Sequence, residues 1–206
     1  MTVKFRQFSF LISAPKLANC PADIGVEVAF AGRSNAGKSS AINALTDNKK
    51  LARTSKTPGR TQLINFFSID NQPDSPRIVD LPGYGYAKVP LTTKLHWQKH
   101  LNQYLEERQS LQGLVLLMDS RQPFQDFDMM LLNWSKAAQM PIHLLLTKSD
   151  KLKPNQSRNQ LFQAKKVIED YPHASIQLFS STKKTGLSDL KNQLNQWLLP
   201  KNTDSE

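Results

Sequence analysis

The sequence predicts a three-layer, doubly wound α/β domain with a mostly parallel sheet of about six strands and one antiparallel edge strand. Short apolar runs of strand length alternate with segments of helical periodicity along most of the chain. A loop with the pattern G-x-x-x-x-G-K-[ST] joins the first of these runs to a helix. The chain has 206 residues, a length that suits one domain with its own core.

The first half of the chain alternates predicted strands and helices. Residues 63–69 and 77–81 are separated by a polar turn, so they form a hairpin that supplies the antiparallel strand. Trp97, Leu101 and Tyr104 recur at three to four residues, which is the apolar stripe of an amphipathic helix. In order, the elements are a strand at 26–31, a helix at 39–45, a basic loop at 49–61, strands at 63–69 and 77–81, and a helix at 94–108.

The second half continues the alternation with buried strands. Residues 114–118 and 142–146 are continuous apolar runs, which are typical of interior parallel strands covered on both faces. The last strand is expected at 175–179, and helices at 126–138, 155–169 and 187–199.

These elements divide the chain into three parts. Residues 1–23 form an N-terminal extension that packs on the domain and includes a short strand or tether in its apolar stretch. The domain itself covers 24–199, and 200–206 are predicted to be a disordered tail.

Composition limits the class of protein. The balance of 27 Lys and Arg against 17 Asp and Glu gives a net charge of +10, which favours polyanionic partners such as nucleic acid, an anionic membrane or phosphorylated ligands. The single Cys20 excludes an internal disulfide, so a reducing, cytoplasmic compartment is expected. No window holds the ~18 consecutive apolar residues of a membrane span.

The loop GRSNAGKS (32–39) lies between the first strand and the first helix, the context in which this pattern binds phosphates. Its glycines let backbone N–H groups face phosphate oxygens, and the helix N-terminus adds positive partial charge. Lys38 is expected to bridge the β- and γ-phosphates, and Ser39 to ligate Mg²⁺.

Two further motifs follow strands of the same sheet. Asp80 of DLPG (80–83) ends a strand, where a carboxylate can hold Mg²⁺ through water and Gly83 can approach a γ-phosphate closely. Asp150 of TKSD (147–150) can accept both N1–H and N2–H of guanine, which adenine does not offer. The stem of Lys148 can lie along the base and its ammonium can reach back to the phosphate loop.

Together with a late FSS (179–181), these motifs resemble the translation-factor-related P-loop GTPases, which have the Ras-like G domain. Within that class, TPGRTQ (57–62), DLPGYGY (80–86) and TKSD are similar to the EngB (YihA/YsxC) family of bacterial GTP-binding proteins, in the TrmE-Era-EngA-EngB-septin-like superfamily. The resemblance extends over residues 24–199.

The resemblance implies a site for GTP or GDP with Mg²⁺. Thr61 would be the second Mg²⁺ ligand as part of a first switch, with Thr57 as the competing position; Phe179 to Ser181 would meet the guanine O6, although Ser181 to Lys183 can also be aligned with that motif. Catalysis would involve Lys38, Thr61 and Gly83, and Mg²⁺ would be held by Ser39, Thr61 and, through water, Asp80. The expected nucleotide-binding residues are Gly32, Arg33, Ser34, Asn35, Ala36, Gly37, Lys38, Ser39, Ser40, Gly59, Arg60, Thr61, Gln62, Leu63, Asp80, Leu81, Pro82, Gly83, Thr147, Lys148, Ser149, Asp150, Phe179, Ser180 and Ser181.

Two positions bear on the rate of hydrolysis. Tyr84 follows Gly83, where Ras-like enzymes have a water-orienting Gln, so intrinsic hydrolysis is expected to be slow. Asn35 resembles the residue that helps to hold K⁺ in some related GTPases, or it simply caps its own loop; equal hydrolysis rates in Na⁺ and K⁺ buffers would exclude the K⁺ role.

The resemblance also implies partners. Lys49, Lys50, Arg53, Lys56 and Arg60 form a basic run that includes the first switch. The family resemblance assigns such a surface to ribosomal RNA, with a role in assembly of the large (50S) ribosomal subunit and a link to normal cell division and septation. We expect a monomer without a membrane partner. The alternatives are a P-loop ATPase or kinase, a membrane-surface GTPase, and an RNA-binding module with negligible hydrolysis.

Overall fold

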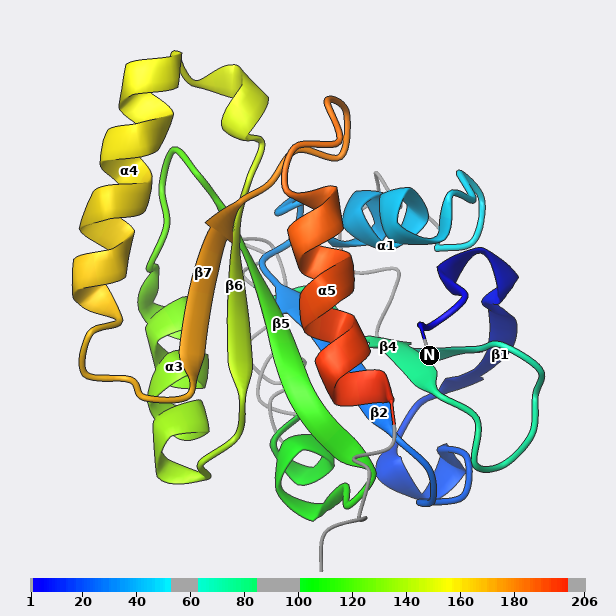
Figure 1. Ribbon diagram of the computed structural model, residues 1–206. Helices are drawn as coiled ribbons and strands as arrows, with labels where there is room; N and C mark the ends of the chain where they lie inside the picture. The colour runs from blue at the N-terminus through cyan, green and yellow to red at the C-terminus, as the bar shows by residue number, and fades with distance from the viewer. Residues whose placement is uncertain (1, 53–62, 85–100, 200–206) are drawn as a thin grey trace, which may run out of the picture.

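The computed structural model describes residues 2–52, 63–84 and 101–199. Its centre is a seven-stranded sheet with the strand order β1-β3-β4-β2-β5-β6-β7 (Figure 1). The strands are β1 (Ser9–Ala14), β2 (Glu27–Gly32), β3 (Ile64–Ser68), β4 (Arg77–Asp80), β5 (Leu111–Asp119), β6 (Ile142–Thr147) and β7 (Ala174–Leu178).

The predicted fold class is confirmed, and the count of six strands is one too low. Five strands run parallel through β4, β2, β5, β6 and β7, and β3 pairs antiparallel with β4 as the hairpin predicted. The extension supplies β1, which pairs antiparallel with β3 from Ser9 opposite Ser68 to Ala14 opposite Ile64. The antiparallel strand is therefore internal, because β1 satisfies backbone groups that β3 would otherwise leave open at an edge.

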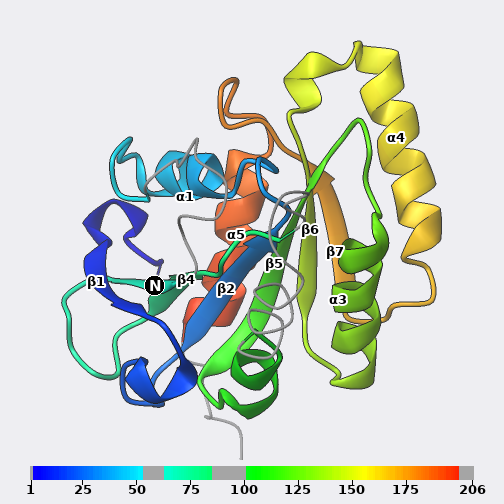
Figure 2. The ribbon, with the colours of Figure 1, turned by 180° about the vertical axis from the view of Figure 1, so that it is seen from behind.

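Helices cover both faces of the sheet (Figures 1 and 2). On one face, α1 (Lys38–Thr46) and α5 (Leu187–Leu198) pack with the N-terminal 3-10 turn η1 (Phe5–Gln7) against Val28 and Phe30 of β2. On the other face lie the helical residues 101–107, α3 (Asp126–Ala137) and α4 (Pro154–Val167). Adjacent residues of β2 thus face opposite cores, as the two-residue period of a strand requires.

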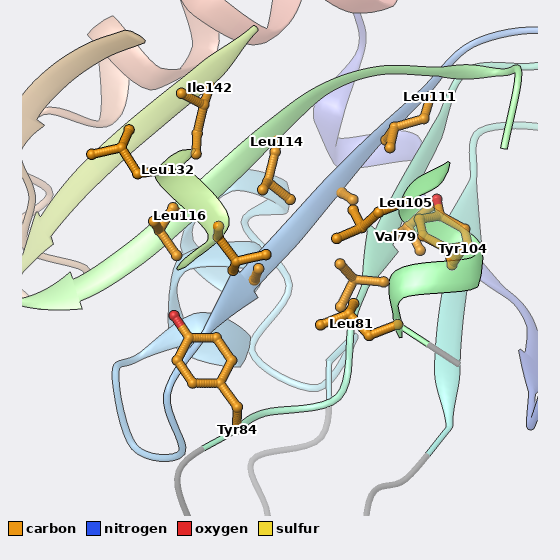
Figure 3. Packing of buried hydrophobic residues seen from close by; sticks show 14 of the residues in the cluster. Val79, Leu81, Tyr84, Tyr104, Leu105, Leu111, Leu114, Leu116, Leu132 and Ile142 are labelled. Carbon is orange, nitrogen blue, oxygen red and sulfur yellow. The ribbon is translucent and has the colours of Figure 1, made fainter. Parts of the chain in front are cut away.

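The core between the sheet and the second group of helices brings together distant parts of the chain. Figure 3 shows Leu81, Tyr84 and Tyr104 with the β5 residues Leu114 and Leu116, all buried. Both segments that flank residues 85–100 are therefore packed against one core. The loop 53–61, the first part of the predicted helix 94–108 and the tail 200–206 lie outside the described residues. No helix in the described ranges has the length and apolar character needed to cross a bilayer.

A buried carboxylate joins the amino-terminal ends of the parallel strands. Glu27 begins β2 and is fully buried. It accepts hydrogen bonds from Arg77 Nε at 2.6 Å, from Arg108 Nε at 2.9 Å and Nη2 at 2.7 Å, and from the Tyr104 hydroxyl at 2.9 Å. The guanidinium groups of both arginines also bond the backbone of the N-terminal extension, at Ala22. One charge therefore holds the extension, β2, β4 and the end of the helical segment together.

Removing this charge should strongly destabilise the protein. In Glu27→Gln the buried Arg77 guanidinium loses its carboxylate partner and Arg108 keeps only the partly exposed Asp23, at 3.4 Å, so we expect the free energy of unfolding in urea to fall by about 3–5 kcal/mol. Asp47→Asn is the matched control, because Asp47 pairs with Arg6 and Lys184 but its side chain is 43% exposed, and it should cost less than about 1 kcal/mol. Equal losses in the two variants would contradict this role of Glu27.

Candidate functional site

The loop between β2 and α1 has a backbone that only particular residues adopt easily. Asn35 has φ +64° and Gly37 has φ +98°, both in the left-handed region. A Cβ on Gly32 would lie 2.8 Å from the carbonyl oxygen of Leu117 in β5, so the loop leaves the sheet too closely for a side chain. Thr147 Oγ1 donates to the Ala36 carbonyl at 2.6 Å, which fixes the loop to the end of β6.

Lys38 and Asp80 meet at the carboxyl ends of β2 and β4. The Lys38 ammonium, in the first turn of α1, donates to Asp80 Oδ1, and both side chains are nearly buried. Ser39 is the next residue of α1 and is half-buried. Ser39 and Asp80 supply oxygen atoms suited to Mg²⁺, and Lys38 supplies a cation suited to phosphate. Binding of Mg²⁺ and phosphate would replace the direct contact between Lys38 and Asp80.

The segment after Asp80 runs against the phosphate loop. Ser34 N–H donates to the Tyr84 carbonyl at 2.7 Å, and a Cβ on Gly83 would lie 3.5 Å from the Ser34 backbone. Pro82 is buried at the same junction. The side chain of Leu81 is 1% exposed and packs in the core on the same side as Val79 (Figure 3), so only its backbone could meet a ligand. The nucleotide-binding role of this position stays a prediction.

Tyr84 points inward, away from the surface of the loop. Its ring lies 4.1 Å from the Phe127 ring, between centroids, and its hydroxyl donates to Asp128 of α3 at 2.5 Å. Burial raises the pKa of both groups, so Tyr84 remains a protonated donor. The residue at the position of the Ras glutamine therefore anchors the second motif to α3.

The TKSD segment (147–150) and the FSS segment (179–181) line a cavity beside the phosphate loop. Ser180 Oγ donates to Asp150 Oδ1 at 2.6 Å, and Ser149 N–H and Oγ both donate to the Phe179 carbonyl, at 3.2 and 3.1 Å. The cavity has a volume of about 230 Å³. Its walls are Gly37, Ser40, Thr147, Lys148, Asp150, Lys151, Phe179, Ser181 and Thr182.

A carboxylate fixed by a serine and facing a cavity can accept two hydrogen bonds from a planar ligand edge. Ser181 and Thr182 both line the cavity, whereas Ser180 is fully buried and orients Asp150. Lys148 differs from the expectation, because its ammonium lies 3.0 Å from Asp119 Oδ2 at the end of β5 rather than reaching back to the phosphate loop. The carboxylate attracts the ammonium across the neighbouring strand end.

A larger cavity of about 450 Å³ also borders the phosphate loop, and most of its lining residues were not among the predicted site residues. Arg33 to Ala36 and Lys148 form part of its lining, together with Asp119, Arg121, Gln122 and Asp128. Asp119 ends a buried strand just as Asp80 does, and this position was the signal that could have identified it. Within the described ranges, no three His, Cys, Asp or Glu side chains are grouped so that they could hold a metal by themselves.

Part of the predicted site cannot be placed. Thr57, Gly59, Arg60, Thr61 and Gln62 lie outside the described residues. Leu63 is described and precedes β3, where its side chain is 38% exposed. The structure thus brings together the phosphate loop, DLPG, TKSD and FSS at one edge of the sheet, where ligands of open α/β sheets bind.

Comparison with known proteins agrees with this geometry. A family model described as "50S ribosome-binding GTPase" matches residues 27–148. The probable GTP-binding protein EngB of Hydrogenovibrio crunogenus (strain DSM 25203 / XCL-2) is 53% identical over 195 residues, which are 94% of this chain and 91% of that protein.

Two solved structures show the same fold. A crystal structure of a probable GTP-binding protein EngB has a TM-score of 0.65 at 23% identity and covers 84% of this chain and 98% of its own. The structure of Era in complex with MgGDPNP and nucleotides 1506–1542 of 16S ribosomal RNA also has a TM-score of 0.65 at 23% identity, covering 89% of this chain and 60% of its own.

The Tyr84 anchor predicts a stability difference between two tyrosines. Tyr84→Phe leaves the buried carboxyl of Asp128 without one donor, so the free energy of unfolding should fall by about 1–3 kcal/mol. Tyr171→Phe is the matched control, because its hydroxyl donates to Asn133 at an exposed site and should contribute less than about 1 kcal/mol. Chemical denaturation measures both, and a loss no larger for Tyr84 than for Tyr171 would exclude the anchor.

Proposed function

Because the chain belongs to the EngB family of GTP-binding proteins, we propose that it is a Mg²⁺-dependent GTPase switch in the assembly of the large ribosomal subunit. The GTPase class follows from the family itself. Mg²⁺ dependence, slow hydrolysis, the roles of individual residues and the ribosomal partner belong to the proposal. The observation that carries it is the junction of the phosphate loop with the Asp150–Ser180 pair, because it places a phosphate cradle beside a carboxylate suited to guanine.

The residues act mainly by binding and positioning. The loop from Gly32 to Ser39 would hold the phosphates, with Lys38 exchanging the Asp80 carboxylate for phosphate oxygens. Ser39 and Asp80 supply the hard oxygen donors that Mg²⁺ prefers, and Thr61 would complete them. When bound, the metal ion supplies electrostatic stabilisation of the charge that develops on the phosphates.

Hydrolysis would be slow because no glutamine follows Gly83. Tyr84 is committed to α3 through its hydroxyl, so it offers no group to orient water. Gly83 lies against the phosphate loop, where its N–H can respond to the γ-phosphate. A nucleotide that orders Thr61 and Gly83 would thereby change the affinity for a partner. The K⁺ role of Asn35 stays a prediction, and its left-handed backbone fits either alternative.

A basic surface beside α1 fits an RNA partner. The Asp47 carboxylate, which follows α1, lies 2.7 Å from the Arg6 guanidinium of η1 and 3.8 Å from the Lys184 ammonium before α5. Lys49 and Lys50 continue the chain from Asp47, Lys183 adjoins Lys184, and all are exposed. These five cations outnumber the one carboxylate among them, and such an excess attracts phosphate backbones.

The family description points to the 50S subunit as the source of that RNA. Era, of which 60% matches this fold, has been solved in complex with a fragment of 16S ribosomal RNA, and this is consistent with the proposed RNA partner. We extend this to the present chain as a cytoplasmic monomer that acts on the large subunit. The link to cell division rests on the family resemblance alone.

Asp150 should decide nucleotide affinity. Asp150→Asn replaces an acceptor of the guanine N1–H by a donor in part of its orientations, so we expect GDP affinity to fall about 100-fold in a fluorescence titration. Ser180→Ala keeps the carboxylate and should cost only a few fold. The control is Asp126→Asn on the exposed first turn of α3. Unchanged GDP binding by Asp150→Asn, or displacement of GTP by equimolar ATP in the wild type, would contradict guanine recognition.

The basic surface should decide subunit binding. We expect the variant with Lys49, Lys50, Lys183 and Lys184 changed to Ala to sediment less with 50S subunits. Its salt dependence should be flatter by about one unit of slope for each phosphate that the variant no longer neutralises. The matched control changes Lys165 and Lys166 of α4, two exposed lysines of another surface.

Both variants should bind GTP like the wild type, since none of these lysines lines the 230 Å³ cavity that we propose holds guanine, called the guanine cavity below. Co-sedimentation should be stronger with a GTP analogue than with GDP. Equal binding in the two nucleotide states would exclude the switch, and absence of binding in both would exclude the ribosomal role.

A further inference from the structure

Asp119 is the meeting point of two cations at the end of β5. Its carboxylate accepts hydrogen bonds from Arg121 Nε at 2.9 Å, from Arg121 Nη2 at 2.6 Å and from the Arg121 backbone N–H at 3.0 Å. The same Oδ2 atom lies 3.0 Å from Lys148 Nζ. A bidentate guanidinium contact fixes the plane of a carboxylate, so the oxygen that faces Lys148 has a defined position.

The backbone at this point brings the two strand ends into register. Asp119 lies opposite Thr147 in the β5–β6 pairing, and Ser120 N–H donates to the Thr147 carbonyl at 2.9 Å. Lys148 follows with φ +57°, so its side chain leaves the strand end in a direction set by a left-handed residue. Its ammonium then meets Asp119, and Lys148 forms part of the wall of both the 230 Å³ and the 450 Å³ cavity.

The charge on Asp119 is secure. The hydrogen bond from Arg121 first, and the contact with Lys148 in addition, hold the pKa of this carboxyl far below its usual range. The carboxylate is 22% exposed and Lys148 33%, so neither is fully hydrated. A lysine has four rotatable side-chain bonds, and a fixed partner for its ammonium reduces the number of conformations that a ligand must select.

We propose that Asp119 is a positioning residue for Lys148, which it holds at the wall of the guanine cavity, and that Arg121 fixes the carboxylate in turn. This inference rests on the proposed guanine-nucleotide site. Asp119 touches no ligand in this scheme. It acts by ordering Lys148 before the base arrives, so that less conformational freedom is lost on binding.

A double-mutant cycle tests the link between the two residues. The affinity for a fluorescent GDP derivative is measured for the wild type, Asp119→Asn, Lys148→Met and the double variant. Asp119→Asn should weaken binding about 3- to 10-fold in the wild type, as expected for the loss of one partly exposed hydrogen bond. In the Lys148→Met background, which keeps most of the stem without the ammonium, it should change the affinity less than about twofold.

Asp47→Asn is the matched control, because this carboxylate also lies between a guanidinium and an ammonium but belongs to neither cavity. It should bind GDP like the wild type. If Asp119→Asn fails to fold, Arg121→Gln replaces it, since that variant keeps the carboxylate and loses its orientation. It should weaken GDP binding about two- to threefold in the wild type and leave Lys148→Met unaffected.

The outcomes separate this inference from the proposed function. Unchanged affinity in Asp119→Asn, or an equal loss in both backgrounds, would overturn the positioning role, because a merely structural effect does not depend on the Lys148 ammonium. Unchanged affinity in Arg121→Gln would overturn the role of Arg121. Failure of the wild type to bind GDP at all would instead overturn the proposed guanine site.

Discussion

The buried carboxylate of Glu27 is the contact on which the arrangement of the sheet depends. Its two arginine partners and Tyr104 come from β4, from the turn before β5 and from the helical segment, and they join the N-terminal extension to the amino-terminal ends of the parallel strands. Each of these partners matters, because a buried ion that loses a partner cannot be solvated by water in its place. The Glu27 cluster thus occupies the amino-terminal ends of the parallel strands, and the loops of the site begin at their carboxyl ends.

That opposite end forms the site, and each parallel strand contributes to it where it stops. Gly32, Asp80, Asp119 and Thr147 end β2, β4, β5 and β6, and Phe179 follows β7. The loops they begin are tied to one another by short hydrogen bonds, such as those of Thr147 with Ala36 and of Ser180 with Asp150. The Thr147 hydroxyl thus connects the end of β6 directly to the phosphate loop.

The basic side chains of the described residues pair with carboxylates at several places in the molecule. Arg77 and Arg108 neutralise Glu27 in the interior, Lys38 faces Asp80, and Lys148 shares Asp119 with Arg121. These cations are engaged within the domain. Lys184 instead pairs with Asp47 at an exposed site, where an ion pair contributes little to stability. Within the part of the chain that the structure describes, the exposed lysines beside the end of α1 are one place where positive charge faces outward.

Local patterns in the sequence were enough to predict the alternating strands and helices, the phosphate loop, and the placement of DLPG and TKSD after strands, because each depends on neighbouring residues and on the two- or 3.6-residue periods. They could not show that β1 completes the sheet, since its pairing with β3 joins residues 50 to 59 positions apart. Nor could they show that Leu81 and Tyr84 turn into the core or that Asp119 meets Lys148. Those contacts depend on which strand ends and helices the folded sheet places side by side, and only the tertiary structure decides that.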